Sequence, residues 1–176
     1  MRFVPGRREA SVSGPVVAGA QPPTLVRPSF EAIALGLAWA IAERSTCARL
    51  RVGCVITTAD FRQVGWGYNG NVAGGPNACD RFGERAVGGC GCIHAELNAL
   101  MKCDWPPGTP KVLINTDSPC EMCAKCILQK GGFQRVLYAR EYRNPAGIDL
   151  LRRHGVAVER FNAPSWGPTL VPTESE

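Results

Sequence analysis

From residue 94 to residue 161, short apolar runs typical of strands alternate with segments rich in helix-forming residues. This alternation constrains the fold more than any other feature, because strands that alternate with helices form a largely parallel sheet covered on both faces. In chain order, the expected elements are a helix at 94–103, a strand at 111–115, a helix from 118 to 130, a strand at 135–139, a helix at 145–153 and a strand at 156–161.

The chain before this region predicts one helix and an antiparallel pair of strands. Ser29 is a suitable helix N-cap, and apolar residues then recur at helical spacing from Phe30 to Ile41. Two strand-like runs, Val52–Thr58 and Arg62–Tyr68, follow with a short polar turn between them. The expected order is therefore α-β-β-α-β-α-β-α-β, which is an α/β fold.

The helix that follows the 111–115 strand has the clearest predicted start. Ser118 would be its N-cap, Pro119 would occupy the first helical position, and Glu121 would complete a capping box. The pair Gly131-Gly132 would end the helix.

Both ends of the chain are expected to be irregular. Residues 1–28 contain five Pro and three Gly without apolar periodicity, which predicts a flexible N-terminal tail. Residues 163–176 predict an irregular C-terminal tail. The remaining domain, residues 29–162, has a size that suits a single hydrophobic core.

Composition excludes several classes of protein. The 176-residue chain has no run of about 18 uncharged apolar residues, so we expect no membrane span. Its net charge of +5 suits a phosphorylated small molecule or a nucleic acid as partner, and equally suits ordinary solubility. Nine cysteines, an odd number, favour metal binding over a disulfide scaffold and indicate a reducing compartment. We therefore expect a cytoplasmic protein.

His94, Cys120 and Cys123 form the strongest candidate for a catalytic metal site. They lie at the starts of two predicted helices, and the strand between those helices brings both starts to one sheet edge. Cys120 and Cys123 are three residues apart and so share a helix face, where the helix N-terminus favours thiolates. One imidazole and two thiolates suit Zn²⁺ and leave a fourth position for water, as in catalytic zinc sites.

Glu96 lies two residues after His94, so its side chain can reach the reacting groups without being a ligand. A carboxylate there can take a proton from water and return it to a ring nitrogen and a leaving amine. The combination His-x-Glu with Pro-Cys-x-x-Cys is the signature of zinc nucleobase deaminases. The alternative is a closed structural site with Cys126 as fourth ligand. We interpret Cys126 instead as a core thiol, like Cys54 and Cys103.

Over roughly residues 30–161 the chain resembles the deoxycytidylate (dCMP) deaminases of the cytidine deaminase superfamily. The resemblance implies a three-layer α-β-α fold, a five-stranded mixed sheet whose last strands are parallel, and assembly into a homo-oligomer. It also implies hydrolysis of an amidine C–N bond, converting dCMP to dUMP and ammonia, with zinc-bound hydroxide attacking C4 and Glu96 shuttling protons. The segments that carry it are RSTCARLRVGCVI (44–56), GYNG (67–70), HAELNAL (94–100), SPCEMCAK (118–125) and residues 131–159.

The same resemblance implies residues that would bind a small-molecule nucleotide. Asn69 would hold the sugar hydroxyl, although asparagine at this point is also typical of a plain turn. The backbone amide of Ala95 would face the pyrimidine carbonyl. Arg49 and Arg51 occupy positions at which the family carries basic residues and would bind the 5′-phosphate, with Tyr142 as a further candidate. Each arginine is equally compatible with a solvated surface charge.

Some members of this family hold a second, structural zinc, and the resemblance implies one here. Its ligands would be Cys47, Cys79, Cys90 and Cys92, which would order a loop of about 25 residues. The alternative is four reduced cysteines in a mobile loop.

Several functional alternatives stay open. Val72 stands where effector-regulated members have proline, so feedback by deoxynucleoside triphosphates is not expected. Asn115 and Asp117 replace the family's usual residues, which leaves a modified deoxycytidylate, a triphosphate or a nucleoside as possible substrates. A tRNA or polynucleotide deaminase is a further alternative, although the chain lacks a long basic run or an aromatic-studded strand. The last is a non-catalytic zinc-binding paralogue, against which the intact Glu96 argues.

Overall fold

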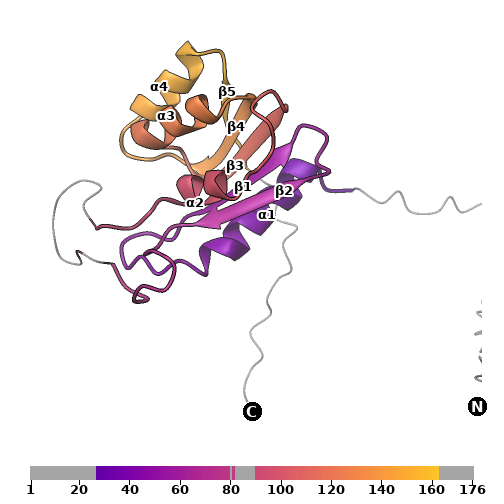
Figure 1. Ribbon diagram of the computed structural model, residues 1–176. Helices are drawn as coiled ribbons and strands as arrows, with labels where there is room; N and C mark the ends of the chain where they lie inside the picture. Colours follow the sequence, from indigo (N-terminus) through magenta and orange to yellow (C-terminus); the bar gives the residue numbers. More distant parts are fainter. Residues whose placement is uncertain (1–26, 80, 82–89, 163–176) are drawn as a thin grey trace, which may run out of the picture.

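A computed structural model describes residues 27–79, 81 and 90–162 (Figure 1). Both tails predicted from the sequence lie almost entirely outside these residues. The described part has the predicted order of elements. These are α1 (Phe30–Ala42), β1 (Gly53–Thr58), β2 (Val64–Tyr68), α2 (Ala95–Met101), β3 (Lys111–Asp117), α3 (Glu121–Lys130), β4 (Phe133–Arg140), α4 (Ala146–Arg153) and β5 (Ala157–Arg160).

The five strands form one mixed sheet in the order β2-β1-β3-β4-β5. Strand β1 runs antiparallel to both of its neighbours, β2 and β3. Strands β3, β4 and β5 are parallel to one another, because each of their connections crosses over through a helix. The predicted mixed sheet with parallel last strands is thereby confirmed.

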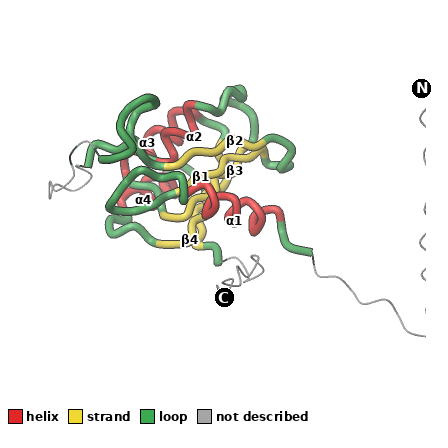
Figure 2. Tube along the Cα trace, turned by 90° about the horizontal axis from the view of Figure 1, so that it is seen from below, coloured by secondary structure: helices red, strands yellow, loops and turns green. Residues whose placement is uncertain are grey.

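Helices cover both faces of the sheet, which confirms the predicted three layers (Figures 1 and 2). Helix α1 packs alone on one face, where Leu35 and Ala38 meet Val55, Ile114 and other apolar strand residues. Helices α2, α3 and α4 share the other face and bury the larger apolar cluster. All seven residues of β3 are buried, because this central strand is covered on both sides.

The predicted start of α3 was wrong by two residues. Its N-cap is Cys120, and the helix begins at Glu121. Ser118 instead directly follows β3, and its hydroxyl oxygen accepts a hydrogen bond from the backbone amide of Tyr142 at 2.8 Å. A long-range partner therefore overrides the local capping pattern. The predicted end is confirmed, since Gly131 is the C-cap with φ of 74°, a conformation that favours glycine.

No helix in the described part of the chain is both long and apolar enough to span a bilayer.

Candidate functional site

Two helix starts converge at one edge of the sheet. His94 is the N-cap of α2, and Cys120 is the N-cap of α3. The Nδ1 atom of His94 lies 3.5 Å from Sγ of Cys120 and 3.4 Å from Sγ of Cys123. Strand β3 separates the two helices in the chain and brings their starts together in space, as predicted.

The spacing of these three donor atoms fits a tetrahedral zinc ion. Zn–S and Zn–N bonds of about 2.3 and 2.0 Å at tetrahedral angles place sulfur and nitrogen about 3.5 Å apart. The two observed sulfur–nitrogen distances match this spacing. Within the residues that the structure describes, no fourth His, Cys, Asp or Glu joins the cluster, so Cys126 is not a member.

The electrostatics of the cluster favour a thiolate. Hydrogen bonds from Cys123 and then from His94 lower the pKa of the Cys120 thiol to about 4. The hydrogen bond with Cys120, followed by burial, raises the pKa of Cys123. The pKa of His94 is raised, chiefly by its hydrogen bond with Cys120. One sulfur is therefore held as an anion, which is the form that binds metals.

Glu96 lies on the first turn of α2, beside this cluster but not part of it. Its side chain is buried, with 5% of the residue exposed. Burial raises the pKa of the Glu96 carboxyl to about 7, although backbone hydrogen bonding and the charge of His94 act in the opposite direction. Glu96 therefore lies close to the candidate ligands without being one of them.

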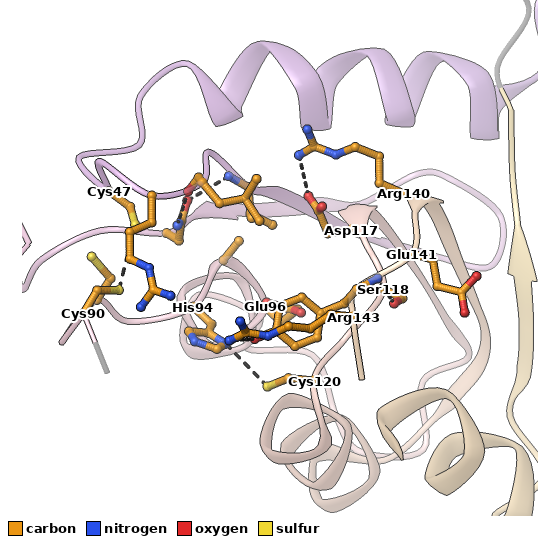
Figure 3. A pocket seen from close by; sticks show the side chains of 17 residues that line it. Cys47, Cys90, His94, Glu96, Asp117, Ser118, Cys120, Arg140, Glu141 and Arg143 are labelled. Carbon is orange, nitrogen blue, oxygen red and sulfur yellow. Dashed lines mark hydrogen bonds and ion pairs between the residues drawn. The ribbon is translucent and has the colours of Figure 1, made fainter. Parts of the chain in front are cut away.

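The cluster opens onto a cavity of about 420 Å³ (Figure 3). Glu96, His94 and Cys120 lie on one side of this cavity, and Asp117 and Arg140 lie on the opposite side, toward α1. Asp117 and Arg140 are the last residues of β3 and β4, so that side of the cavity lies at the strand ends. Ligands in α/β proteins commonly bind at such carboxyl ends of parallel strands.

Asn69 lines this cavity but is also tied to the chain around it. Its Oδ1 accepts hydrogen bonds from Ser45 Oγ at 2.7 Å and from the backbone amide of Val52 at 2.8 Å. Its Nδ2 donates to the carbonyl oxygen of Leu50 at 2.7 Å. Asn69 thus holds residues 45–52 in place, a role that the sequence did not indicate.

The remaining predicted substrate residues separate into two groups. Ala95, Arg49 and Tyr142 line the cavity. Arg51 does not, because its guanidinium donates to the carboxylate of Glu43 at the surface. From the sequence, Arg49 and Arg51 were equally good candidates for binding the phosphate. Only their surroundings in the folded protein distinguish them.

The structure adds Arg140 to the cavity wall, a residue that sequence reasoning missed. Its Nη2 donates to Oδ2 of Asp117 at 2.7 Å and to the carbonyl of Arg51 at 3.2 Å. Its guanidinium also lies over the ring of Trp39, 4.7 Å from the centroid. The sequence could have indicated Arg140 in one way, because it ends a strand that runs parallel to the strand ending at Asp117.

Four further cysteines meet beside the same cavity. Cys47, Cys79, Cys90 and Cys92 have their sulfur atoms within 4.8 Å of one another. The closest pairs are separated by 3.5 to 3.9 Å. A tetrahedral Zn²⁺ with four thiolates requires sulfur–sulfur distances of about 3.8 Å. The four residues named from the sequence are therefore brought together with suitable spacing.

The fold and this donor set define a class, the cytidine deaminase-like α/β proteins with a zinc-binding region. Residues 30–140 match the family described as "Cytidine and deoxycytidylate deaminase zinc-binding region", and the chain belongs to this family. Zinc is the metal for which the family's site is described, and the cluster of His94, Cys120 and Cys123 is compatible with it.

The chain is also similar to proteins whose names are established. The chain is 38% identical over 124 residues to "ComE operon protein 2" of Bacillus subtilis, covering 68% of this chain and 65% of that protein. It is 33% identical over 147 residues to the deoxycytidylate deaminase of Saccharomyces cerevisiae, covering 78% of this chain and 46% of that protein. The chain thus spans less than two thirds of either relative.

The chain is also similar to a solved structure. The dCMP deaminase from the cyanophage S-TIM5, in complex with dCMP and dUMP, superposes with a TM-score of 0.67 at 30% sequence identity. The match covers 78% of this chain and 100% of that one.

Proposed function

We propose that this protein is a hydrolase that removes the 4-amino group of a deoxycytidine nucleotide, converting dCMP and water to dUMP and ammonia. The observation that carries the proposal is the buried carboxyl of Glu96 beside a His-Cys-Cys cluster at the side of a nucleotide-sized cavity. The likeness to a dCMP deaminase with dCMP and dUMP bound supports this choice of substrate.

In this proposal His94, Cys120 and Cys123 hold the zinc ion. When bound, zinc supplies a Lewis acid that lowers the pKa of a coordinated water from about 15.7 to about 7. Glu96 would move two protons in turn: it takes the first proton of the attacking water and gives it to ring nitrogen N3, then takes the remaining hydroxyl proton and gives it to the amino group, which leaves as ammonia. Its place next to the cluster but outside it supports this role, and its burial excludes bulk water as a competing proton donor.

The nucleotide would be held by residues around the rest of the cavity. The backbone amide of Ala95 would donate to the pyrimidine carbonyl, and the remaining Nδ2 hydrogen of Asn69 would face the sugar hydroxyl. We assign the 5′-phosphate to Arg49 and Tyr142, because both line the cavity. Arg51 is a poor candidate, because Glu43 already neutralises it away from the cavity.

We also propose that Cys47, Cys79, Cys90 and Cys92 hold a second, structural zinc. Their sulfur spacing supports this site, and burial raises the pKa of Cys92, so a free thiolate there would be costly without a metal. Cys47, Cys90 and Cys92 also line the cavity, so this metal would stabilise one of its walls.

The proposal also includes the compartment of the protein and its assembly with further copies. None of the nine cysteines, all of which the structure describes, forms a disulfide, which supports a reducing, cytoplasmic compartment. Exposed apolar side chains on α1, including Phe30 at 60% and Ile33 at 45%, support assembly with further copies of the chain. Sedimentation of the zinc-loaded protein would test the second point.

A substrate panel tests the activity. Ammonia release should be measured with dCMP, CMP, dCTP, deoxycytidine, 5-substituted dCMP, dAMP and a cytosine-containing single-stranded oligonucleotide, with Glu96→Gln as the inactive control. The proposal expects turnover of dCMP above the others. If only the oligonucleotide is turned over, the protein is a polynucleotide deaminase and the proposal is wrong. The absence of any turnover by the zinc-loaded protein would support a non-catalytic role.

A further inference from the structure

We infer that Gly67 and Gly147 are positioning residues for the metal centre. Each allows the backbone of one ligand-bearing helix to lie close enough for the three ligand atoms to meet. This inference rests on the metal site proposed above.

Gly147 is in the first turn of α4, which packs against the start of α3. A Cβ atom at this position would lie 2.1 Å from the carbonyl oxygen of Pro119 and 2.8 Å from the carbonyl carbon and oxygen of Cys120. These neighbours are backbone atoms of the ligand segment itself, so no side-chain rotation can relieve the overlap. The backbone of Gly147 is ordinary helix, so the need for glycine here is one of space and not of conformation.

Gly67 allows a similarly close approach between strand β2 and helix α2. It lies in β2, and a Cβ atom there would lie 2.4 Å from the backbone nitrogen of Ala99 and 2.5 Å from the carbonyl oxygen of Ala95. Both atoms belong to the backbone of α2, whose N-cap is His94. The strand and the helix that follows His94 can therefore approach each other this closely only with glycine at position 67.

The size of these overlaps matters because metal sites tolerate little displacement. Ordinary van der Waals contact of a Cβ atom begins at 3.4 Å, so relief of either overlap requires the facing backbones to separate by about an ångström, and we expect the ligand-bearing helix to take up much of that shift. Metal–ligand distances are held to about 0.2 Å. A methyl group at position 147 or 67 would therefore separate His94 Nδ1 from the two sulfur atoms by more than a tetrahedral ion can bridge.

Cobalt substitution tests this directly, because Co²⁺ reports on zinc sites through its visible absorption. Metal-free protein is titrated with Co²⁺ for wild type, Gly147→Ala and Gly67→Ala. The spectrum of Cys120→Ser is subtracted, so that only the site formed by His94, Cys120 and Cys123 is followed. The component that remains in Cys120→Ser reports the four-cysteine cluster in the same molecules.

The chain offers matched controls. Gly65 lies in the same strand as Gly67, and Gly36 lies in helix α1, and a Cβ atom at either position would meet nothing within 4 Å. Leu35→Ala, on the opposite face of the sheet, lowers stability without touching α2 or α3. These three variants should bind Co²⁺ at the His94 site as wild type does.

We expect Gly147→Ala and Gly67→Ala to bind Co²⁺ at the His94 site at least about tenfold more weakly, the scale found when the groups that orient metal ligands are altered. The four-cysteine component should stay unchanged. Wild-type affinity in both variants would overturn the inference and leave the proposed function standing. Failure of both variants to fold, while Gly65→Ala and Gly36→Ala fold, would make these glycines folding requirements and would also overturn it. Absence of a His94-site signal in wild type would remove the proposed metal site and the inference with it.

Discussion

Asn69 and Val52 are joined by a hydrogen bond of 2.8 Å from the backbone amide of Val52 to the side-chain oxygen of Asn69. The bond ties a cavity-lining side chain to the end of the segment that carries Cys47 and Arg49. The side-chain amide of Asn69 also accepts a hydrogen bond from Ser45 Oγ and donates one to the carbonyl oxygen of Leu50, so this one side chain holds residues 45–52 in place.

We therefore expect Asn69→Ala to affect both stability and substrate binding. Three hydrogen bonds are lost, each worth about 1 kcal/mol, so the free energy of unfolding should fall by about 2–3 kcal/mol. The KM for dCMP should rise as Arg49 loses its fixed position. Urea unfolding and steady-state kinetics measure the two effects. Gln63→Ala, which removes an exposed amide, is the control. A change in KM without loss of stability would contradict the structural part of this role.

Glu96→Gln should abolish turnover and leave the protein folded with its metal. The amide keeps the shape of the side chain but cannot accept and return a proton, so kcat should fall by at least about 100-fold. Ammonia release gives kcat, and metal analysis with circular dichroism gives zinc content and fold. Turnover near the wild-type rate would remove Glu96 from the mechanism.

Replacing Cys90 and Cys92 together by serine should remove one zinc ion per chain. Two of four thiolates are lost, and the hydroxyl groups that replace them are poor ligands for zinc. We expect zinc content to fall from two ions to one and the unfolding temperature to fall with it. Cys103→Ser changes a buried cysteine outside both clusters and should keep two ions. One ion in wild type, unchanged in the double variant, would argue against a second site.

The carboxylate of Glu31 should stabilise the fold only above acidic pH. The backbone hydrogen bond at the start of α1 lowers the pKa of Glu31, and a hydrogen bond from Arg135 acts in the same direction. A carboxyl whose pKa is lower when folded contributes stability above its ordinary value of 4.5 and loses it as the pH falls below.

Glu31→Gln should therefore cost up to about 1 kcal/mol at pH 7, and less as the pH drops through the range below 4.5. Denaturant unfolding of the metal-free protein at several pH values measures the difference from wild type. A difference that stays constant with pH would mean that the charge of Glu31 contributes nothing.

Asn115→Leu should stabilise the protein. Asn115 is fully buried in β3, and neither of its side-chain polar atoms has a hydrogen-bond partner among the described residues. An unsatisfied buried amide costs about 1–3 kcal/mol, and leucine has nearly the same shape. Thermal unfolding should show a higher midpoint, with Thr57→Val as a parallel test of the other orphaned group. A lower midpoint would mean that a buried water satisfies the amide.

Much of this architecture could be predicted because it depends on local patterns. Apolar spacing and glycine positions predicted every element between residues 30 and 160, since side-chain periodicity decides which segments form strands and helices. The motifs at His94 and Cys120 predicted two adjoining helix starts, since a strand and its crossovers leave little freedom in where such starts lie. The four other cysteines were likewise named as a group, but through a family resemblance.

Other features depend on neighbours that are distant in the chain. Ser118 resembles an N-cap in sequence, but the amide of Tyr142 captures its hydroxyl. Arg49 and Arg51 look alike, yet only Arg49 reaches the cavity, because Glu43 draws Arg51 to the surface. Gly147 carries no local signal, and its importance arises only where α4 meets the backbone of Cys120. The sequence by itself determined which elements form and where the candidate ligands His94, Cys120 and Cys123 lie on them, since both follow from short-range periodicity and spacing. The tertiary structure decided which side chains share the cavity, because long-range packing, charge pairing and available space act only once the chain has folded.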